Sequence, residues 1–382
     1  MFTKSPIESK VLNEKIKNIK PNLQRITILP TLVCNLRCKF CHVWGTNGWA
    51  LKGVKKINEQ LNIDSLKDFI NEANKNNKFD IVLSGGEPLL YNSLQELIEF
   101  LYSKNIKINI LTNGLKLIDH ASFLTDHACF ISISIDGSAQ VHDNIRNKQN
   151  LFDTVCNGIE EIIELKSKKS KPFPVIQINY VISEYNYNNI SEFIVSIRNR
   201  FASLKVNIKF KQDFISRPKD LILTFEPLLF TTKARGEDYA DIMLEHLNCK
   251  VTETWESFIK DEIKIDSKAV AEVLKREWDN AKINYSDNVD IIEYFENISN
   301  VFGRTRCISP WQKLVIGPNG SSYFCPDLPD YSVGNINNNS FEEIWVGKPA
   351  EHFRRIMKER LFPVCNRCCS LFSNFNIEQV KE

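Results

Sequence analysis

The sequence lacks long hydrophobic runs, an export signal and an excess of charge of either sign. No apolar stretch approaches the roughly 18 residues of a membrane-spanning helix, and residues 1–20 show neither the apolar core nor the cleavage site of a signal peptide. Lysine and arginine total 49 against 47 aspartates and glutamates, which leaves a net charge of +2. We therefore expect no membrane span, no nucleic-acid partner and a cytoplasmic location.

Methionine is also scarce, with three residues, whereas cysteine reaches 11. An odd number of thiols in a chain without an export signal argues against a disulfide framework. Six of the 11 cysteines fall into two tight groups, within residues 34–41 and 365–369. Clustered cysteines in a reducing compartment are typical of metal sites.

The region 25–213 alternates short strands rich in isoleucine and valine with amphipathic helical patterns. Six such units predict an α/β fold with a parallel sheet, open or partly closed into a barrel. In either form the ligand site lies at the carboxyl ends of the strands. The predicted strands are residues 25–33, 80–84, 107–112, 130–135, 175–182 and 205–211, and the predicted helices are 63–74, 94–103, 154–165 and 190–201.

Three further segments flank this region. Residues 1–24 form an N-terminal extension, and residues 214–300, which contain a single glycine, predict a helical bridge or cap. In residues 301–382 glycine, proline and cysteine return with short β-like pieces. We expect a small loop-rich domain there, which a bound metal would stabilise.

The first cysteine group, Cys34-x3-Cys38-x2-Cys41, follows the first predicted strand. Three thiolates on one loop can hold three irons of a [4Fe-4S] cluster and leave the fourth iron open to another ligand. Zinc is the alternative, but a structural zinc ion takes four protein ligands. His42 is poorly placed to complete such a set from the same loop.

The segment CNLRCKFC at residues 34–41 resembles the signature of radical S-adenosylmethionine (SAM) enzymes, and later motifs match the family in order and spacing. These motifs are SGGEP at 84–88, LTNG at 111–114, SISIDG at 132–137 and HDNIR at 142–146. The resemblance implies that Cys34, Cys38 and Cys41 bind iron and that Phe40, Gly85, Gly86, Glu87, Pro88, Asn113, Ser134 and Arg146 bind SAM.

Within this set, the resemblance directs the glycines at the SAM amino group, Ser134 at its ribose and Arg146 at its carboxylate. Glycine suits the first role because it lets backbone carbonyls approach an ammonium group closely. The alternatives are an ordinary strand serine for Ser134 and a surface charge for Arg146.

The resemblance also implies a fold and a chemistry. Residues 25–213 would form a partial (βα)6 barrel, and an electron from a flavodoxin- or ferredoxin-type donor would enter the cluster. SAM would then break into a 5′-deoxyadenosyl radical that abstracts hydrogen from the substrate. A non-catalytic iron–sulfur scaffold is the competing interpretation, but a scaffold has no need for the GGEP motif.

The downstream cysteines resemble an auxiliary-cluster module called SPASM, in particular its shortened form, called twitch. A full module carries seven cysteines for two clusters, and this chain has five, followed by 13 residues without another cysteine. We therefore expect one auxiliary [4Fe-4S] cluster, with Cys369 as a spare thiol or an alternative ligand; a zinc ribbon is the alternative. The predicted ligands, called the second cysteine group below, are Cys307, Cys325, Cys365 and Cys368.

Asp327 is the candidate catalytic base. In sulfatase-maturing relatives an aspartate directly follows the cysteine of a Gly-x4-Cys motif, whereas here Pro326 takes that position and Asp327 comes one residue later. This departure puts sulfatase maturation in doubt, and an ordinary turn residue is the alternative for Asp327.

The substrate is either a ribosomally made peptide or a small polar metabolite such as an amino sugar. Many peptide maturases carry a leader-binding domain before the barrel. The 24 residues that precede the first predicted strand therefore weaken the peptide interpretation without removing it.

Overall fold

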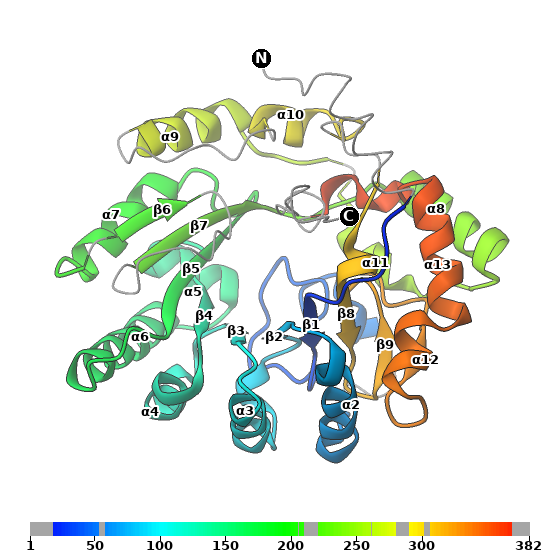
Figure 1. Cartoon of the computed structure of the whole chain (residues 1–382). Helices are drawn as coiled ribbons and strands as arrows, with labels where there is room; N and C mark the ends of the chain where they lie inside the picture. Colours follow the sequence, from blue (N-terminus) through cyan, green and yellow to red (C-terminus); the bar gives the residue numbers. More distant parts are fainter. Residues whose placement is uncertain are drawn as a thin grey trace.

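The computed structural model describes residues 18–52, 58–204, 206–209, 221–260, 262–279, 290–301 and 306–368. Cys369, most of the predicted N-terminal extension and the predicted boundary at 213/214 lie outside these residues. The described strands form one sheet in the order β10-β9-β8-β1-β2-β3-β4-β5-β7-β6, which curves around a central space (Figure 1). None of the described helices is long and apolar enough to cross a membrane.

Five parallel strands form the middle of the sheet in chain order. Side chains alternate across β1, so Ile26 and Ile28 are fully buried among the helices while Arg25 and Thr27 line the inner space. The strands are β1 (Arg25–Ile28), β2 (Asp80–Leu83), β3 (Ile108–Thr112), β4 (Phe130–Ser134) and β5 (Val175–Ile182).

Helices cover the outer side of this sheet, as the sequence pattern predicts (Figure 1). The helix α2 shows why: its buried residues Leu66, Phe69, Ile70 and Ala73 recur at helical spacing and form one apolar face. The outer helices are α2 (Ile63–Asn76), α3 (Leu94–Ser103), α4 (Leu117–His127), α5 (Ala139–Arg146), α6 (Leu151–Lys168) and α7 (Ile190–Arg200).

The sixth strand position differs from the prediction. The strand β6 (Val206–Lys209), expected to follow β5, lies at the edge of the sheet, and β7 (Leu221–Pro227) is inserted between them, parallel to both. Residues 221–225 are all buried. A continuous apolar run suits a parallel strand buried on both faces, so β7 takes the interior position. The segment 214–300, expected as a helical bridge or cap, thus contributes the strand β7 to the sheet.

The C-terminal segment extends the same sheet. The strand β8 (Lys313–Ile316) pairs in parallel with β1, Arg25 opposite Lys313. Next to it, β9 (Ser321–Tyr323) and β10 (Gly334–Asn335) continue in antiparallel fashion. At the outer side, the Phe341 N–H donates to Glu72 Oε2 of α2 at 2.8 Å. This region is therefore docked on the barrel at two places.

The remaining elements cover the ends of the curved sheet. The Arg198 guanidinium of α7 lies 3.0 Å from the Glu277 carboxylate of α9. The helices are α8 (Lys233–Leu247), α9 (Ser267–Asp279), α10 (Ile291–Glu296), α11 (Ser309–Gln312), α12 (Phe341–Val346) and α13 (Lys348–Glu359), with 3-10 turns η1 (Trp49–Lys52), η2 (Pro88–Leu90), η3 (Glu253–Phe258) and η4 (Pro363–Arg367).

Candidate active site

The chain that leads to the first cysteine lies against the GGEP motif. The Gly86 N–H donates to the Thr31 carbonyl at 3.0 Å, and the Glu87 N–H donates to the Val33 carbonyl at 2.9 Å. A Cβ atom on Gly86 would stand 2.3 Å from the Leu32 carbonyl oxygen and 2.4 Å from that of Val33. Only glycine permits this approach of two backbones, and the approach fixes the position of the cysteine loop.

Glu87 is a fully buried carboxylate that ties β2 to β3. Its Oε1 accepts hydrogen bonds from the Thr112 hydroxyl at 2.7 Å and the Leu89 N–H at 3.1 Å, and its Oε2 accepts from the Asn113 N–H at 2.8 Å. Burial raises the pKa of Glu87, and these donors oppose the shift. Its carboxylate therefore contacts this chain's own backbone, while Pro88 begins η2 directly after it.

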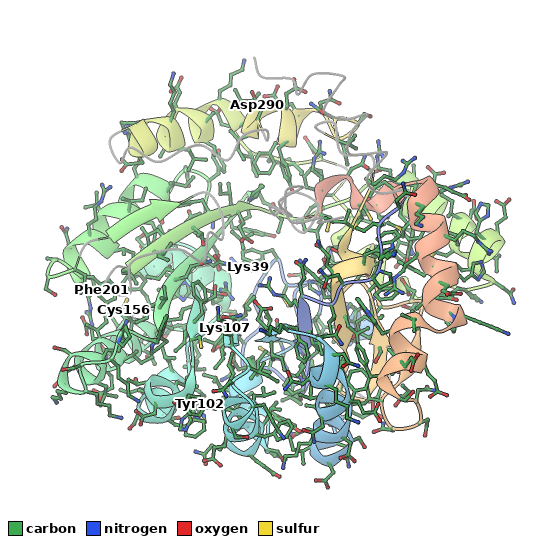
Figure 2. The ribbon with its side chains drawn as sticks, viewed as in Figure 1. Lys39, Tyr102, Lys107, Cys156, Phe201 and Asp290 are labelled. Carbon is green, nitrogen blue, oxygen red and sulfur yellow. The ribbon has the colours of Figure 1, made fainter. Side chains whose placement is uncertain are left out.

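Each sulfur of the first cysteine group receives a hydrogen bond from nitrogen. Trp44 N–H donates to Cys41 Sγ at 3.4 Å, Asn113 Nδ2 to Cys34 Sγ at 3.8 Å, and Arg146 Nη1 to Cys38 Sγ at 3.5 Å. Donors aimed at sulfur stabilise thiolates and are a feature of iron–sulfur sites. Lys39, on the same loop, lies inside the curve of the sheet in this view (Figure 2).

The thiols of this group suit a cluster better than a single metal ion. Among the residues that the structure describes, no three Cys, His, Asp or Glu side chains stand close enough to hold one ion. Zinc needs its ligands about 2.0–2.3 Å away, whereas each thiolate of a cluster binds a different iron. Burial raises the pKa of Cys34 to about 11, so without metal this thiol stays protonated, and metal binding would release its proton.

Arg146 is held by Asp136, which lies just after β4. The Arg146 Nε donates to Asp136 Oδ2 at 2.6 Å, and both side chains are buried. The Arg146 guanidinium also lies 5.8 Å from the centre of the Phe40 ring. Ser134 stands half-buried at the carboxyl end of β4, so it shares the end of the sheet where the cysteine loop lies. The SAM-binding roles of these residues stay predictions.

A cavity of about 350 Å³ lies inside the curved sheet. Its walls come from the inner faces of β1, β2, β3, β4 and β8, from the segment that follows Cys41, and from the loop that follows β9. The lining includes Arg25, Ser84, Gly85, Asn109 and Ser132 from the strands and their ends, His42 and Trp49 near the first cysteine group, and Lys313, Tyr323 and Asp327 from the C-terminal region.

Asp327 lines the inner cavity and also a smaller cavity around Cys325, Cys365 and Cys368. Among the residues that the structure describes, none is a hydrogen-bond partner of its Oδ2. Burial raises the pKa of Asp327, while the nearby His42 and Lys313 oppose the shift. His42 stacks on Phe258 with ring centres 4.7 Å apart, and burial lowers its pKa.

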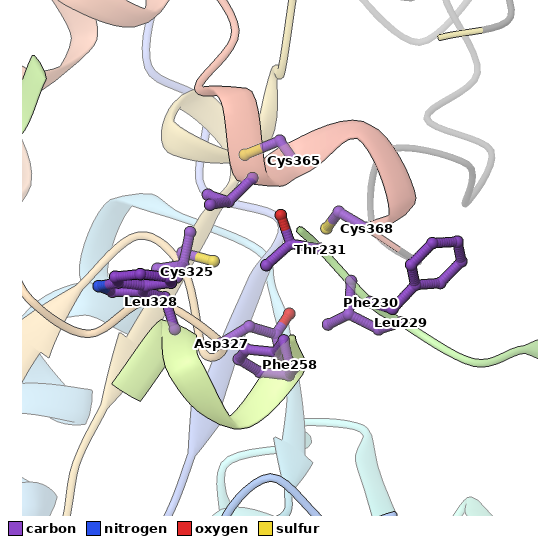
Figure 3. Close-up of a pocket in the computed structure, with 11 residues that line it drawn as sticks. Leu229, Phe230, Thr231, Phe258, Cys325, Asp327, Leu328, Cys365 and Cys368 are labelled. Atoms are coloured by element: carbon purple, nitrogen blue, oxygen red, sulfur yellow. The ribbon is translucent and has the colours of Figure 1, made fainter. Parts of the chain in front are cut away.

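The second cysteine group surrounds a small cavity. The sulfurs of Cys325, Cys365 and Cys368 lie around it, together with Thr231 and Asp327 (Figure 3). Cys307, the fourth predicted ligand, packs with Cys368 against Phe230 and Tyr294. Burial raises the pKa of Cys325 and of Cys365. This is expected for thiols that lose their protons only when metal binds.

Sequence reasoning missed three residues of this site: Asp136, His42 and Lys313. Asp136 belongs to the SISIDG motif, where an acidic residue directly after a buried strand was the available signal. His42 was weighed only as a zinc ligand, and Lys313 is a charged residue at the start of an apolar strand. These residues reach the cysteine groups or the cavity through contacts between segments that lie far apart in the sequence.

Comparison with known proteins agrees with this geometry. The family model described as the radical SAM superfamily matches residues 28–194, and the iron–sulfur cluster-binding domain SPASM matches residues 307–369. The chain thus has a radical SAM domain at residues 28–194 and a C-terminal SPASM domain at residues 307–369. These domains imply [4Fe-4S] clusters and SAM as cofactors, and the two cysteine groups are composed to hold the clusters.

Individual relatives cover different shares of the chain. This chain is 29% identical over 178 residues to the sporulation killing factor maturation protein SkfB of Bacillus subtilis. The alignment covers 46% of this chain and 40% of SkfB. This chain is also 26% identical over 346 residues to a cysteine-type anaerobic sulfatase-maturating enzyme of Clostridium novyi. That alignment covers 84% of this chain and 78% of the enzyme. The chain spans 40–57% of the length of four curated relatives, SkfB among them.

A solved structure supports the fold. The crystal structure of Streptococcus suis SuiB bound to its precursor peptide SuiA superposes with a TM-score of 0.57 at 14% identity, covering 90% of this chain and 69% of SuiB. At this identity the likeness concerns the fold alone. It confirms the expected α/β fold.

Proposed function

We propose that the protein is a radical SAM maturase that modifies one residue of a ribosomally made peptide. When bound, the reduced cluster and SAM supply a 5′-deoxyadenosyl radical that abstracts a hydrogen atom from the substrate. Cys34, Cys38 and Cys41 would hold that cluster. Phe40, Gly85, Gly86, Glu87, Pro88, Asn113, Ser134 and Arg146 would form or support the SAM site.

The observation that carries this proposal is that the lining of the inner cavity includes His42, which follows Cys41, and Asp327, which also lines the small cavity of the second cysteine group. The inner cavity's volume of about 350 Å³ is near the lower end of the range for ligand sites. Such a space admits one side chain with its adjoining backbone, or one small metabolite, and excludes a folded protein. A substrate bound there would thus lie beside segments that adjoin both cysteine groups.

The peptide substrate is favoured over a small metabolite by the relatives. SkfB is named for maturation of a sporulation killing factor, and SuiB was solved with a precursor peptide. An amino sugar remains the second candidate, because the cavity is also large enough for a small polar molecule.

Asp327 is our candidate base. Its side chain lines both the inner cavity and the small cavity of the second cysteine group, and its Oδ2 has no hydrogen-bond partner within the described part of the chain. Cys307, Cys325, Cys365 and Cys368 would hold one auxiliary [4Fe-4S] cluster, which would accept or relay an electron from the substrate. A flavodoxin- or ferredoxin-type protein would supply the electron that starts the reaction.

The test compares Asp327→Asn with Asp119→Asn, a matched change at an exposed carboxylate on α4. Each reconstituted protein is incubated anaerobically with SAM, dithionite and peptides encoded beside its gene. We expect wild type and Asp119→Asn to form 5′-deoxyadenosine and change the mass of one peptide. Asp327→Asn should still form 5′-deoxyadenosine but lose about 100-fold or more in modified peptide, the lower end of general base effects.

Two results would contradict the proposal. Product formation from an amino sugar with no change in any peptide would assign the metabolite function instead. Persistent absence of 5′-deoxyadenosine from cluster-loaded wild type would favour the scaffold interpretation.

A further inference from the structure

Cys38 differs from its two neighbours in the charge of its hydrogen-bond donor. Cys34 faces the neutral amide of Asn113, and Cys41 faces the backbone N–H of Trp44. Cys38 instead faces the guanidinium of Arg146, with Nη1 3.5 Å from its sulfur. Cys38 and Arg146 are both buried, with 7% and 8% of their surfaces exposed, so water screens this contact little.

The guanidinium is fixed from behind by a buried network. Asp136 accepts from Arg146 Nε at 2.6 Å through Oδ2 and from the Val181 N–H at 2.9 Å through Oδ1. The Asp136 N–H donates to His142 Nδ1 at 3.0 Å, and the Asn186 amide donates to the Asp136 carbonyl at 3.0 Å. A side chain held at this many points keeps a single rotamer, so the cation stays beside the sulfur.

The cysteine loop is docked on the same helix that carries Arg146. The Lys39 N–H donates to the Ile145 carbonyl at 2.9 Å, and the Lys39 ammonium donates to Asn144 Oδ1 at 2.9 Å. The end of α5 thus contacts the loop through three consecutive residues, the third being Arg146. The contact between Arg146 and Cys38 is part of a built interface between helix and loop.

We infer that Arg146 is a positioning residue that sets the reduction potential of the SAM-site cluster through the sulfur of Cys38. Hydrogen bonds to sulfur and nearby charge are two of the factors that determine cluster potentials. A cation and an N–H···S bond both favour the more negative, reduced cluster. The role rests on the proposed function only in requiring that the cluster binds, and it is separate from the predicted contact with the SAM carboxylate.

The two roles are compatible because an arginine has five N–H donors. Asp136 and Cys38 occupy donors on all three nitrogens, and each terminal nitrogen keeps one further N–H. Lysine has no such fork and holds its charge at one point. It therefore cannot contact Asp136 and Cys38 in the same manner, and Arg146→Lys separates charge from geometry.

The experiment is a redox titration of anaerobically reconstituted full-length protein, followed by electron paramagnetic resonance (EPR). The SAM-site cluster is identified as the one whose signal changes when SAM is added. Four variants are compared with wild type: Arg146→Gln, Arg146→Lys, the double variant Asp136→Asn/Arg146→Gln, and Arg37→Gln. Arg37 is the matched control, since this cation of the same loop bonds the Cys34 and Leu36 carbonyls and stacks on Trp44.

For Arg146→Gln we expect the equilibrium constant for reduction to fall at least 10-fold, which is 59 mV for a one-electron couple. In Arg146→Lys the equilibrium constant should fall less, because the positive charge remains. In the double variant the constant should also fall less, because the positive and the negative charge are removed together. Arg37→Gln should change the constant less than 3-fold.

A cluster in Arg146→Gln with normal iron content and a potential no further shifted than in Arg37→Gln would overturn the inference. If Arg146→Gln fails to bind iron, the test of the inference rests on Arg146→Lys and the double variant. Wild-type reduction potentials in both of these variants would equally overturn the inference. Failure of wild type itself to form a cluster that SAM perturbs would instead remove the proposed function. The two failures are therefore distinguishable.

Discussion

The two cysteine groups differ in their surroundings, although backbone N–H groups also face Cys325 and Cys365 of the second group. The first lies on a polar loop, and each of its sulfurs receives a hydrogen bond from Trp44, Asn113 or Arg146. The second lines a small cavity together with apolar side chains such as Leu229, Leu328 and Val364. The difference teaches that the first site depends on particular polar neighbours, whereas the second depends chiefly on its cysteines and on packing.

Removal of a cysteine from each group gives the largest expected contrast. Cys38→Ala should abolish 5′-deoxyadenosine formation, a loss above the 10–100-fold that supporting residues of a metal site contribute. Cys365→Ala should keep that reaction and lose peptide modification. Each variant should retain about four of about eight irons per chain. Equal loss of 5′-deoxyadenosine in both would show that the two sites are not separable.

Glu87→Gln tests the polar support of the first site. A glutamine amide offers one acceptor oxygen, so part of the set of Thr112, Leu89 and Asn113 donors would face an NH2 group. We expect a loss of about 1–3 kcal/mol in the free energy of unfolding, measured by denaturant titration. The control Glu96→Gln removes an exposed pair with Lys67 and should cost less than about 1 kcal/mol. Equal effects would show that burial of Glu87 carries no stability.

Ser340→Ala tests the second region away from its cysteines. Ser340 caps α12 in a capping box with Glu343, so its loss should cost about 0.5–2 kcal/mol. Hydrogen exchange should speed up in α12 while the EPR signal perturbed by SAM stays unchanged. A change in that signal would contradict the separation of the two regions.

The smallest effect is expected at a surface ion pair distant from both sites. Hydrogen bonds from Lys169 and Lys171 lower the pKa of Asp126 below its ordinary value of 3.8. The stabilisation is therefore fully present above pH 3.8 and is lost only as the pH falls through the lower folded pKa. Asp126→Asn should cost less than about 1 kcal/mol, equally at pH 5 and pH 7. A cost that changes between these values would contradict the assignment.

The sequence was sufficient for the central strands and for the first cysteine group. Both depend on local signals: apolar runs bounded by turn residues, and a cysteine spacing followed by motifs at the strand ends. The order of β6 and β7 was not accessible, because it depends on which of the two strands pairs with β5. The same holds for β8, whose pairing with β1 joins segments far apart in the chain.

The candidate site divides in the same way. Glu87 and Asn113 were found through their motifs, but their actual contacts with Thr112 and Cys34 needed the fold. The contact between Arg146 and Cys38 spans 108 residues. A single sequence carries no signal for a pairing at that distance.

The central claim is that two separate clusters flank one substrate cavity and that only one of them binds SAM. EPR of reduced, anaerobically reconstituted wild type with and without SAM tests this most directly. The account predicts signals from two [4Fe-4S] clusters, one altered by SAM and absent in Cys38→Ala, the other unaltered by SAM and absent in Cys365→Ala. A single cluster signal, or two signals that SAM leaves unchanged, would contradict it.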